Sequence, residues 1–220
     1  MSERRCGTHF LNTQSKAALR RALRAARRSI KPSQARQAAL AATDALTSTR
    51  RWRQARTVAL FLSGDGEIHT DELIARAQAA GKRVYLPVIR PPRGRAGRRA
   101  ALAGGTLVFR RFTPTTPLRR GLLGIDEPVA TPAAGRRAQA ICSLAHLDLM
   151  VMPLVGFDHA GNRLGMGAGF YDRTLGQRRG FRGPYRVGLA HECQRVEALP
   201  HDPWDWQLDA CVTDQHIYTW

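Results

Sequence analysis

The chain has 220 residues and a mass of 24.4 kDa, with 43% hydrophobic and 24% charged residues. This length buries a core without disulfide or metal staples, and the composition is that of a soluble globular protein, which excludes a disordered chain and a small stapled scaffold. The net charge of +18 is uneven, because residues 1–56 carry 14 basic and 2 acidic side chains and residues 90–140 carry 11 and 2.

The N-terminal region contains two predicted helices. We expect residues 1–14 to be a flexible N-terminus and residues 15–220 to form one domain. In KAALRRALRAARRSI, arginines surround a single apolar face, which is typical of a basic amphipathic helix. The residues of that face are Leu19, Leu23, Ala26 and Ile30. Pro32 ends the helix, and the Ala-rich segment 33–47 predicts another.

A strand, a helix and a second strand follow. TVALFL at 57–62 is a short apolar run of strand-forming residues, and the turn-prone SGDGE comes after it. DELIARAQAA at 71–80 predicts a helix with Thr70 as N-cap and Gly81 as C-terminal stop, and RVYLPVI at 83–89 predicts a strand. This βαβ pattern is that of a parallel sheet covered by helices, so the sequence indicates an α/β fold.

The remainder of the chain supplies further strands. PPRGRAGRRA at 91–100 has no apolar periodicity and predicts an exposed loop without core residues. TLVFRRF at 106–112 predicts a strand and is followed by a turn-rich segment. LDLMVM at 147–152, YRVGLA at 185–190 and the segment 210–214 predict further strands of the same sheet.

The motif that carries chemistry is PLVGFDHAGNRLGMGAGFYDRTL, residues 153–175, which follows a buried strand and leads into a predicted helix. It contains neither the GxxxxGK[ST] of a P-loop nor the GxGxxG of dinucleotide folds. Instead, Gly165, Gly167 and Gly169 alternate with other residues. Glycines at this density let the backbone approach a ligand closely, and successive N–H groups leading into a helix form an anion cradle.

Two charged residues flank this glycine loop. Arg163 stands just before it and could clamp phosphate, and Asp172 stands just after it and could hold a hard cation such as Mg²⁺. Together they indicate nucleotide phosphates with a metal. The alternative is a Gly-rich turn with Asp172 as a surface or capping residue, and the spacing alone does not decide between the two.

The segment FDHAGNRLGMGAGFYDRTL resembles the signature of the 5-formyltetrahydrofolate cyclo-ligase family, also called 5,10-methenyltetrahydrofolate synthetases. Lys16, Leu19 and Arg20 are similar to that family's N-terminal basic helix. VALFLSGDGEIHTDELIARAQAAGKRVYLPVI, with Glu67, resembles its first βαβ segment, and VGLAHECQRVEALPHDPWDWQLDACVTD resembles its C-terminal block. The resemblance therefore runs from Lys16 to Ile217.

The resemblance implies a three-layer αβα sandwich around a mainly parallel sheet, with a basic N-terminal helix. It also implies conversion of 5-formyltetrahydrofolate to 5,10-methenyltetrahydrofolate, with ATP as co-substrate, Mg²⁺ as cofactor, and release of ADP and phosphate. ATP phosphorylates the formyl oxygen, N10 attacks the activated carbon, and phosphate departs. Phosphoryl transfer asks mainly for positioning and charge neutralisation, which fits a sequence without an evident nucleophile and base.

The resemblance also implies a set of site residues, carried over by matched position. Those that would bind ATP are Lys16, Arg20, Arg163, Leu164, Gly165, Met166, Gly167, Ala168, Gly169, Phe170 and Tyr171. Those that would bind the folate are Leu62, Glu67, Met166, Gly167, Ala168, Gly169 and Phe170, with Glu67 meeting a polar pterin edge. Asp172 and Asp205 would bind Mg²⁺, and Arg163 and Asp172 would be the catalytic residues. Asp202 is an alternative to Asp205, because the loop that holds both can shift register.

The arginine bias of the charged segments has two explanations. Only Lys16, Lys31 and Lys82 of the 35 basic residues are lysines, and high-GC coding supplies arginine together with alanine. The functional explanation is an anion-binding surface, because arginine matches phosphate geometry. One competing hypothesis is therefore an RNA-associated protein that uses the scaffold through its Arg-rich segments, although we do not expect nucleic acid as the biological substrate. Another is a relative that acts on a different formylated or pterin-like compound.

Location is predicted from what the sequence lacks. No stretch approaches the roughly 20 consecutive apolar residues of a membrane-spanning helix, and the N-terminus lacks the apolar core of a secretory signal. The cysteines Cys6, Cys142, Cys193 and Cys211 form no CxxC pair and predict reduced thiols. We expect a cytoplasmic protein without membrane contact and, by default, a monomer. An Arg-rich mitochondrial transit peptide is the alternative for the N-terminus.

Overall fold

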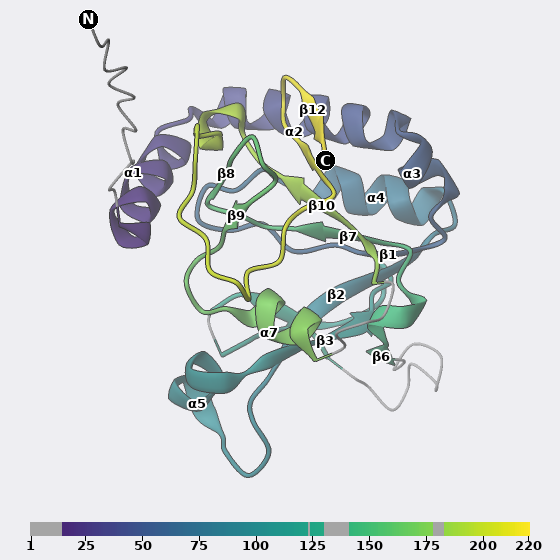
Figure 1. Cartoon of the computed structure of the whole chain (residues 1–220). Helices are drawn as coiled ribbons and strands as arrows, with labels where there is room; N and C mark the ends of the chain where they lie inside the picture. Colours follow the sequence, from purple (N-terminus) through teal and green to yellow (C-terminus); the bar gives the residue numbers. More distant parts are fainter. Residues whose placement is uncertain (1–14, 123, 130–140, 178–182) are drawn as a thin grey trace, which may run out of the picture.

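The computed structural model describes residues 15–122, 124–129, 141–177 and 183–220 (Figure 1). Residues 1–14, which we expect to be flexible, lie outside the described residues. The helices are α1 (Lys16–Arg28), α2 (Pro32–Ser48), α3 (Arg50–Gln54), α4 (Asp71–Ala79), α5 (Gly97–Gly104) and α7 (Phe170–Gly176), with the short 3-10 helices η2 (Leu144–His146) and η3 (Glu192–Gln194). The strands are β1 (Thr57–Ala59), β2 (Arg83–Arg90), β3 (Thr106–Arg111), β4 (Leu118–Arg120), β5 (Asp126–Pro128), β6 (Ile141–Cys142), β7 (Leu149–Met152), β8 (Gly156–Phe157), β9 (Arg163–Leu164), β10 (Tyr185–Leu189), β11 (Ala210–Val212) and β12 (Ile217–Thr219).

An eight-stranded sheet forms the centre of the molecule, in the strand order β12-β11-β10-β7-β1-β2-β3-β6. Strands β11, β10, β7, β1 and β2 pair in parallel, whereas β12 and β3 pair antiparallel with the outer members of that set. The predicted βαβ unit is confirmed, because β1 and β2 pair in parallel with Thr57 opposite Arg83, and α4 connects them. The parallel strands end at one edge of the sheet, which is where α/β proteins bind ligands.

Helices α2, α3 and α4 cover one face of the sheet (Figure 1). Leu46, Trp52 and Leu73 from these helices are buried against Val84 of β2 and Val151 of β7. The apolar surface that these side chains remove from water is the main stabilising contribution of this layer. The layer fixes β1, β2 and β7 in register, and the loops that follow these strands reach the edge described above.

The ends of α4 agree with the sequence, with one difference. Gly81 follows the helix with φ +69, a left-handed conformation that favours glycine at a helix C-terminus. Thr70 is the N-cap residue, but its hydroxyl donates to the carbonyl oxygen of Phe61 at 2.6 Å instead of capping the helix. Thr70 therefore closes the loop between β1 and α4 rather than stabilising the first turn.

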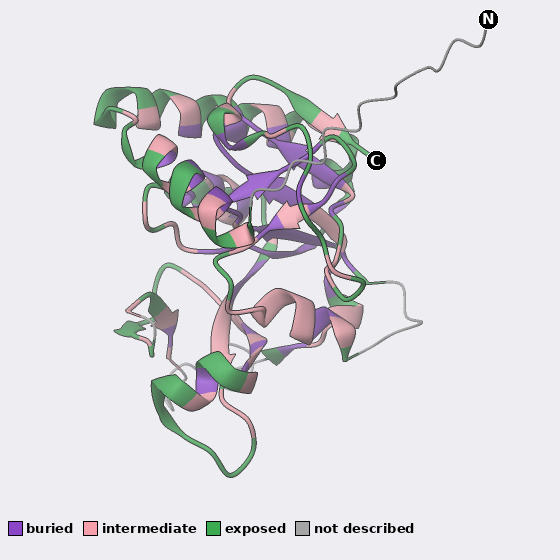
Figure 2. Ribbon diagram, turned by 60° about the vertical axis from the view of Figure 1, so that its left-hand side comes forward, coloured by how far each residue is buried: buried purple, intermediate pink, exposed green. Residues whose placement is uncertain are grey.

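The other face of the sheet is covered by α7 and by the irregular segments around the β8–β9 hairpin. Leu175 of α7 and Phe157 of β8 belong to one buried cluster with Met150 of β7. The backbone N–H of Leu107 donates to the hydroxyl of Thr174 at 2.8 Å, which ties α7 to β3. Figure 2 shows the buried residues concentrated in the sheet between these layers. The predicted three-layer αβα arrangement around a mainly parallel sheet is confirmed, with α7 as the shorter helical layer.

The predicted basic amphipathic helix is confirmed as α1, which lies beside the β8–β9 hairpin (Figure 1). Its apolar face was predicted only in part. Ala26 and Ile30 are half-buried, and the third buried residue after Leu19 and Leu23 is Arg27, which is 1% exposed. A charged side chain is buried on an apolar face only where it is paired.

Two predicted boundaries were wrong. Segment 91–100 is not wholly a loop, because α5 begins at Gly97 and buries Ala101 completely. A helix that buries one alanine produces no apolar periodicity, which is why the sequence did not show it. The strand predicted at 57–62 ends at Ala59, and the chain then leaves the sheet to form the loop before α4.

Several short elements have no counterpart in the sequence prediction. These are α3, the hairpins β4–β5 and β8–β9, and the edge strands β6 and β12. Strands of two or three residues are shorter than the four to eight residues over which alternation can be recognised, so only tertiary pairing defines them. Within the described ranges, no helix combines the length and apolar character needed to cross a membrane.

The packing between β10 and its neighbours gives a test of the fold. A Cβ added at Gly188 would lie 2.7 Å from Leu154 Cδ2 and 2.7 Å from Leu208 Cδ1. We expect Gly188→Ala to lower the free energy of unfolding by about 1–3 kcal/mol through overpacking. Gly183→Ala is the matched control, because nothing lies within 4 Å of its added Cβ. Urea denaturation of both variants checks this, and equal stabilities would contradict the described packing.

Candidate active site

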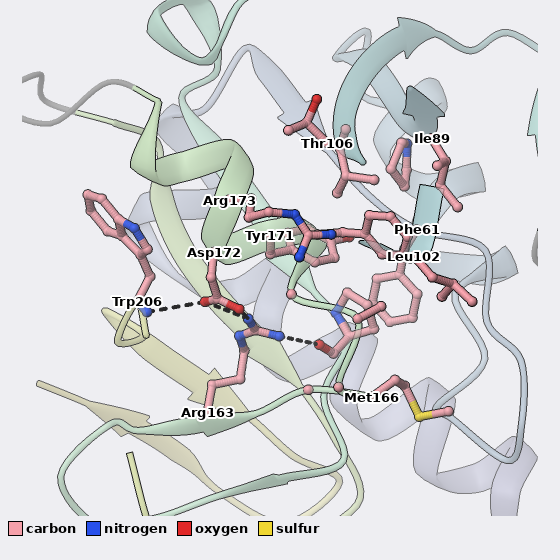
Figure 3. Close-up of a pocket in the computed structure, with 18 of the residues that line it drawn as sticks. Phe61, Ile89, Leu102, Thr106, Arg163, Met166, Tyr171, Asp172, Arg173 and Trp206 are labelled. Carbon is pink, nitrogen blue, oxygen red and sulfur yellow. Dashed lines mark hydrogen bonds and ion pairs between the residues drawn. The ribbon is translucent and has the colours of Figure 1, made fainter. Parts of the chain in front are cut away.

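A cavity of about 1080 Å³ lies at the carboxyl ends of the parallel strands. Its walls come from the loop after β1, the end of β2, the glycine loop before α7, helix α1 and the segment before β11. Figure 3 shows part of this wall, including Phe61, Ile89, Met166 and Trp206. Every residue that the resemblance assigns to the site lines this cavity: Lys16, Arg20, Leu62, Glu67, Arg163, Leu164, Gly165, Met166, Gly167, Ala168, Gly169, Phe170, Tyr171, Asp172 and Asp205. Residues up to 189 positions apart in the chain therefore share one site, whereas their individual roles stay predictions.

The glycine loop passes directly beneath α1. Gly167 has φ +98 and Gly169 has φ +64, so both adopt backbone conformations that favour glycine. The Arg20 guanidinium donates from Nε to the carbonyl oxygen of Gly165 at 2.8 Å, and a Cβ added at Gly167 would lie 3.4 Å from Arg20 Cζ. The positive φ of Gly167 therefore favours glycine at the position where the loop contacts the Arg20 guanidinium.

Lys16 joins α1 to the loop that precedes β11. Its ammonium donates to Asp202 Oδ2 at 2.6 Å and to Asp205 Oδ2 at 2.7 Å. Partial burial alone would lower the pKa of Lys16, but the hydrogen bonds with the two carboxylates outweigh it and raise that pKa. Burial likewise opposes ionisation of Asp205, and the hydrogen bond from Lys16 lowers the pKa of Asp205 overall. Lys16 and Asp205 are therefore charged at neutral pH, and both alternative carboxylates, Asp202 and Asp205, face the same cation.

Arg163 and Asp172 form an ion pair in the cavity wall (Figure 3). The Arg163 side chain is 4% exposed, and its Nη2 donates to both carboxylate oxygens of Asp172 at 3.0 Å. Asp172 Oδ1 also accepts the backbone N–H of Trp206 at 3.2 Å. Asp172 is therefore held in place by two partners. It also stands in the first turn of α7, so the alternative of a capping role stays open beside the metal role.

Two hydrogen-bond donors near this ion pair have no partner. Among the described residues, Nε of Arg163 and Nη2 of Arg173 are buried without a hydrogen bond. Arg173 donates from Nε to the carbonyl oxygen of Gly105 at 2.8 Å and lies over the Phe170 ring, 5.3 Å from its centroid. Burial lowers the pKa of Arg173, and nearby Asp172 opposes that shift. Buried donors without partners are costly, so an anionic ligand in the cavity is favoured.

Another part of the cavity wall is apolar and holds a mostly buried carboxyl group. Phe61, Leu62 and Ile89 line it beside Glu67, whose side chain is 14% exposed. Burial raises the pKa of Glu67, although the positive charge of Arg27 and a hydrogen bond from the Gly64 N–H at 3.1 Å oppose this shift. The cavity therefore combines a cationic, glycine-rich wall with an apolar wall that carries the acids Glu67 and Glu127, the latter accepting the backbone N–H of Ile89 at 3.1 Å.

Residues 12–214 match the model of the 5-formyltetrahydrofolate cyclo-ligase family. The chain belongs to this family. The 5-formyltetrahydrofolate cyclo-ligase of Escherichia coli (strain K12) is 38% identical over 198 residues, which cover 90% of this chain and 100% of that relative. The 5-formyltetrahydrofolate cyclo-ligase of Haemophilus influenzae is 39% identical over 200 residues, which cover 90% of this chain and 97% of that relative.

Solved structures agree with the family assignment. The 5,10-methenyltetrahydrofolate synthetase of Aquifex aeolicus superposes with a TM-score of 0.73 and 26% identity, over 93% of this chain and 92% of that one. The 5,10-methenyltetrahydrofolate synthetase of Mycoplasma pneumoniae superposes with a TM-score of 0.66 and 21% identity, over 91% and 99% of the two chains, and shows the shared fold. The cyclo-ligase fold thus extends over nearly the whole chain.

Sequence reasoning missed several residues of this cyclo-ligase cavity. Arg173 lines it, as do Arg98 and Leu102 of α5. Arg173 carried no signal of its own, since an arginine in the last turn of a helix is an ordinary, favourable placement. The α5 residues carried none, because the helix itself was predicted to be a loop.

The titration of Glu67 gives a test of the electrostatics of this cyclo-ligase site. The pKa of Glu67 is raised above its ordinary value of 4.5, so the folded chain favours the protonated form of this side chain. The protonated form therefore stabilises the fold at low pH, and this stabilisation is lost as pH rises from 4.5 through the folded pKa. We expect the unfolding free energy of Glu67→Gln, relative to the unsubstituted protein, to increase between about pH 4 and about pH 8. Chemical denaturation of both proteins across this range measures the difference, in which all other titrations cancel. A difference that is independent of pH would contradict burial of this acid.

Proposed function

We propose that the chain converts 5-formyltetrahydrofolate to 5,10-methenyltetrahydrofolate and consumes ATP to form ADP and phosphate. The observation that carries this proposal is that one cavity brings together an anion-seeking glycine loop and an apolar pocket with a buried acid. The two ends suit a nucleotide and a pterin, and their shared walls bring the reacting atoms together. Relatives that match nearly the whole chain are named for this reaction.

The reaction needs two bound partners and little covalent help from the protein. The formyl oxygen takes the γ-phosphoryl group of ATP, N10 attacks the formyl carbon, and the C–O bond to phosphate breaks. Each step keeps its atoms within the two substrates, so the protein supplies orientation and neutralises charge. We assign these tasks to residues 15–220 acting as one domain.

The ATP end of the proposed site consists of cations beside glycine backbone. Lys16 and Arg20 project from α1 toward the glycine loop, and Arg163 and Arg173 hold the unpartnered donors. Phosphate oxygens would satisfy those donors and would draw Lys16 away from its carboxylate partners. Lys16 and Arg163 already have carboxylate partners before ATP arrives, so binding at these two cations exchanges partners rather than burying new unpaired charge. Arg20 and Arg173 bond only to backbone carbonyl oxygens and stay available to the phosphates.

The residues present also suit Mg²⁺. Asp172 and Asp205 both offer carboxylate oxygens to the cavity, and magnesium in such sites takes one or two carboxylates together with substrate phosphates and water. In the part of the chain that the structure describes, no three His, Cys, Asp or Glu residues are grouped to hold a metal alone, which supports entry of the ion together with ATP. When bound, Mg²⁺ supplies charge neutralisation at the transferred phosphoryl group.

The folate end is assigned to the loop after β1. Leu62 and Phe61 give an apolar surface for the flat pterin ring, and Glu67 offers a buried acceptor for a polar pterin edge. A buried acid that pairs with pterin N–H groups recovers the cost of its desolvation only with that ligand bound. This selects ring systems with paired donors over other formylated compounds.

The RNA-associated alternative has less support. The relatives reported above are all named for the folate reaction, and the arginines that line the cavity are directed to a small-molecule site rather than to a phosphate backbone. We also propose that the protein acts in the cytoplasm as a monomer. The described cysteines Cys142, Cys193 and Cys211 are all free thiols, which supports a reducing compartment.

A coupled absorbance assay tests the proposed reaction. With 5-formyltetrahydrofolate, ATP and Mg²⁺ we expect formation of the methenyl product, followed at its own absorption band. Omission of ATP should abolish turnover, because the formyl oxygen is then a poor leaving group, and omission of Mg²⁺ should reduce it by at least about tenfold. Turnover without ATP would contradict the phosphorylation step, and folded protein that binds ATP without turnover would remove the folate assignment.

The metal role of Asp172 has a matched control in this chain. We expect Asp172→Asn to raise the Mg²⁺ concentration for half-maximal activity by at least about tenfold, because one carboxylate ligand is lost. Asp209→Asn breaks a comparable pair, since Asp209 Oδ1 accepts from Arg186 Nη2 at 2.7 Å and Asp209 does not line the cavity.

Both variants leave an arginine unpaired, so both should lose stability. Only Asp172→Asn should change the magnesium dependence, measured by titrating Mg²⁺ at saturating ATP. Equal magnesium dependence in the two variants would assign Asp172 to holding Arg163 alone.

A further inference from the structure

The loop between β1 and α4 has an unusual backbone. Asp65 has φ +54, although it is not glycine, and Gly66 follows with φ +75. Two successive left-handed residues reverse the chain sharply and present Glu67 to the cavity. The turn is closed by Gly64 and Glu67, since the Glu67 N–H donates to the Gly64 carbonyl at 2.9 Å and the Gly64 N–H returns a bond to the Glu67 carboxylate at 3.1 Å. The place of the Glu67 carboxylate therefore depends on this strained turn.

Helix α1 holds that turn through Arg24, Arg27 and Arg28, which all donate to the Asp65 carboxylate, and of these three Arg27 is the buried one. The Arg27 side chain is fully buried, and its Nε and Nη2 donate to the carbonyl and carboxylate oxygens of Asp65 at 2.9 and 2.7 Å. Its Nη1 donates to the carbonyl oxygen of Leu154, just after β7, at 2.9 Å. Nη2 also lies 3.7 Å from Glu67 Oε1. One guanidinium thus connects α1, the end of β7 and the loop that carries the buried acid.

The contact also includes the backbone of α1. A Cβ added at Gly66 would lie 3.3 Å from the carbonyl oxygen of Arg27 and 3.3 Å from Cα of Arg28. The turn is therefore packed against the last turn of the helix without room for a side chain. A shift of the helix end toward the loop must move Gly66 and, with it, the next residue, Glu67.

The opposite half of α1 faces the ATP end of the cavity. Lys16, Arg20 and Arg27 follow one another at spacings that place them on the same face of a helix. Lys16 and Arg27 are separated by roughly 16 Å along the axis, at about 1.5 Å per residue. The helix is attached to the body by few apolar side chains, Leu19 and Leu23, so its position depends strongly on the polar contacts at its two ends.

We propose that Arg27 and Asp65 form a positioning clamp through which α1 couples the two ends of the cavity. ATP that engages Lys16 and Arg20 fixes the helix, the helix fixes Asp65 and Gly66, and the turn holds Glu67 where the folate needs it. Each substrate therefore strengthens the binding of the other, and by linkage the factor is the same in both directions. The inference rests on the proposed function, since it takes ATP and 5-formyltetrahydrofolate as the two ligands.

The test measures this coupling directly by calorimetric titration. The nucleotide is magnesium AMP-PNP, whose β–γ bridge resists transfer of the γ-phosphoryl group. It is titrated with and without saturating 5-formyltetrahydrofolate, and the ratio of the two dissociation constants is the coupling factor. We expect a factor of at least about 5 for the unsubstituted protein. The coupling factor should fall below about 2 in Arg27→Lys, which keeps the positive charge but loses the several donors of the guanidinium. It should also fall below about 2 in Asp65→Asn, because asparagine tolerates the left-handed backbone but has no carboxylate.

Arg21→Gln is the control for a change of charge on α1, because it alters an exposed residue of the same helix that does not line the cavity. It should keep the coupling factor of the unsubstituted protein. Circular dichroism identifies the variants that fold, and Asp65→Asn alone suffices if Arg27→Lys does not. A merely structural role for the clamp would lower the melting temperature and the fraction of active protein but leave the coupling factor unchanged.

The outcomes separate this inference from the proposed function. If the folded clamp variants keep the coupling factor of the unsubstituted protein, the clamp is overturned and the proposed function stays intact. The same conclusion follows if the unsubstituted protein binds the two ligands independently. An unsubstituted protein that binds AMP-PNP but no 5-formyltetrahydrofolate overturns both. Loss of coupling in the two clamp variants with retention in Arg21→Gln supports the clamp.

Discussion

The buried guanidinium of Arg27 is the interaction on which the arrangement of the cavity depends. It bonds to Asp65 and to the carbonyl oxygen of Leu154, and so joins a peripheral helix to the ends of two central strands. Removing one partner of a buried ion pair costs about 3–5 kcal/mol, because it leaves an uncompensated charge. The apolar contribution of α1 comes mainly from two leucines, so this polar contact has a comparable weight in holding the helix. The basic helix keeps its place over the glycine loop because one of its arginines faces inward.

The charges of the cavity are arranged in pairs that exist before any ligand is bound. Lys16 faces Asp202 and Asp205, and Arg163 faces Asp172. These pairs are distinct from the arginines that dominate the net charge of +18, and most of the arginines in the described ranges are exposed. The electrostatics of the cavity therefore follow from these local ion pairs and not from the net charge of the chain. A triphosphate with its metal ion is the kind of ligand for which such pairs can exchange partners without leaving a charge isolated.

Much of the architecture could be predicted from the sequence because it follows simple periodicities. Hydrophobic residues repeat over several positions in the βαβ unit, the basic helix and the buried strands, which makes these elements recognisable. The glycine loop is recognisable from its alternating glycines. Arg27 could not be assigned in this way, since a charged residue at a core position looks like part of the polar face until its partner is known. The turn-prone SGDGE marked a turn around Asp65 but not which of its residues is left-handed, and α5 buries too little to show a pattern. The site residues were found through the resemblance, whereas the contacts that position them arise from tertiary structure alone.

The polar groups around the cavity show where stability is lost to function. Arg163 and Arg173 each bury a donor without a partner, and Glu67 is buried with a raised pKa. An unsatisfied buried donor costs about 1–3 kcal/mol, and a core built only for stability would replace these side chains with apolar ones. The same groups become favourable when a phosphate or a pterin edge supplies the missing partner, because the desolvation has already occurred in the free protein. Binding energy at this site is therefore greatest for a ligand that satisfies both ends of the cavity, and ligands that fill only one end leave part of that cost in place.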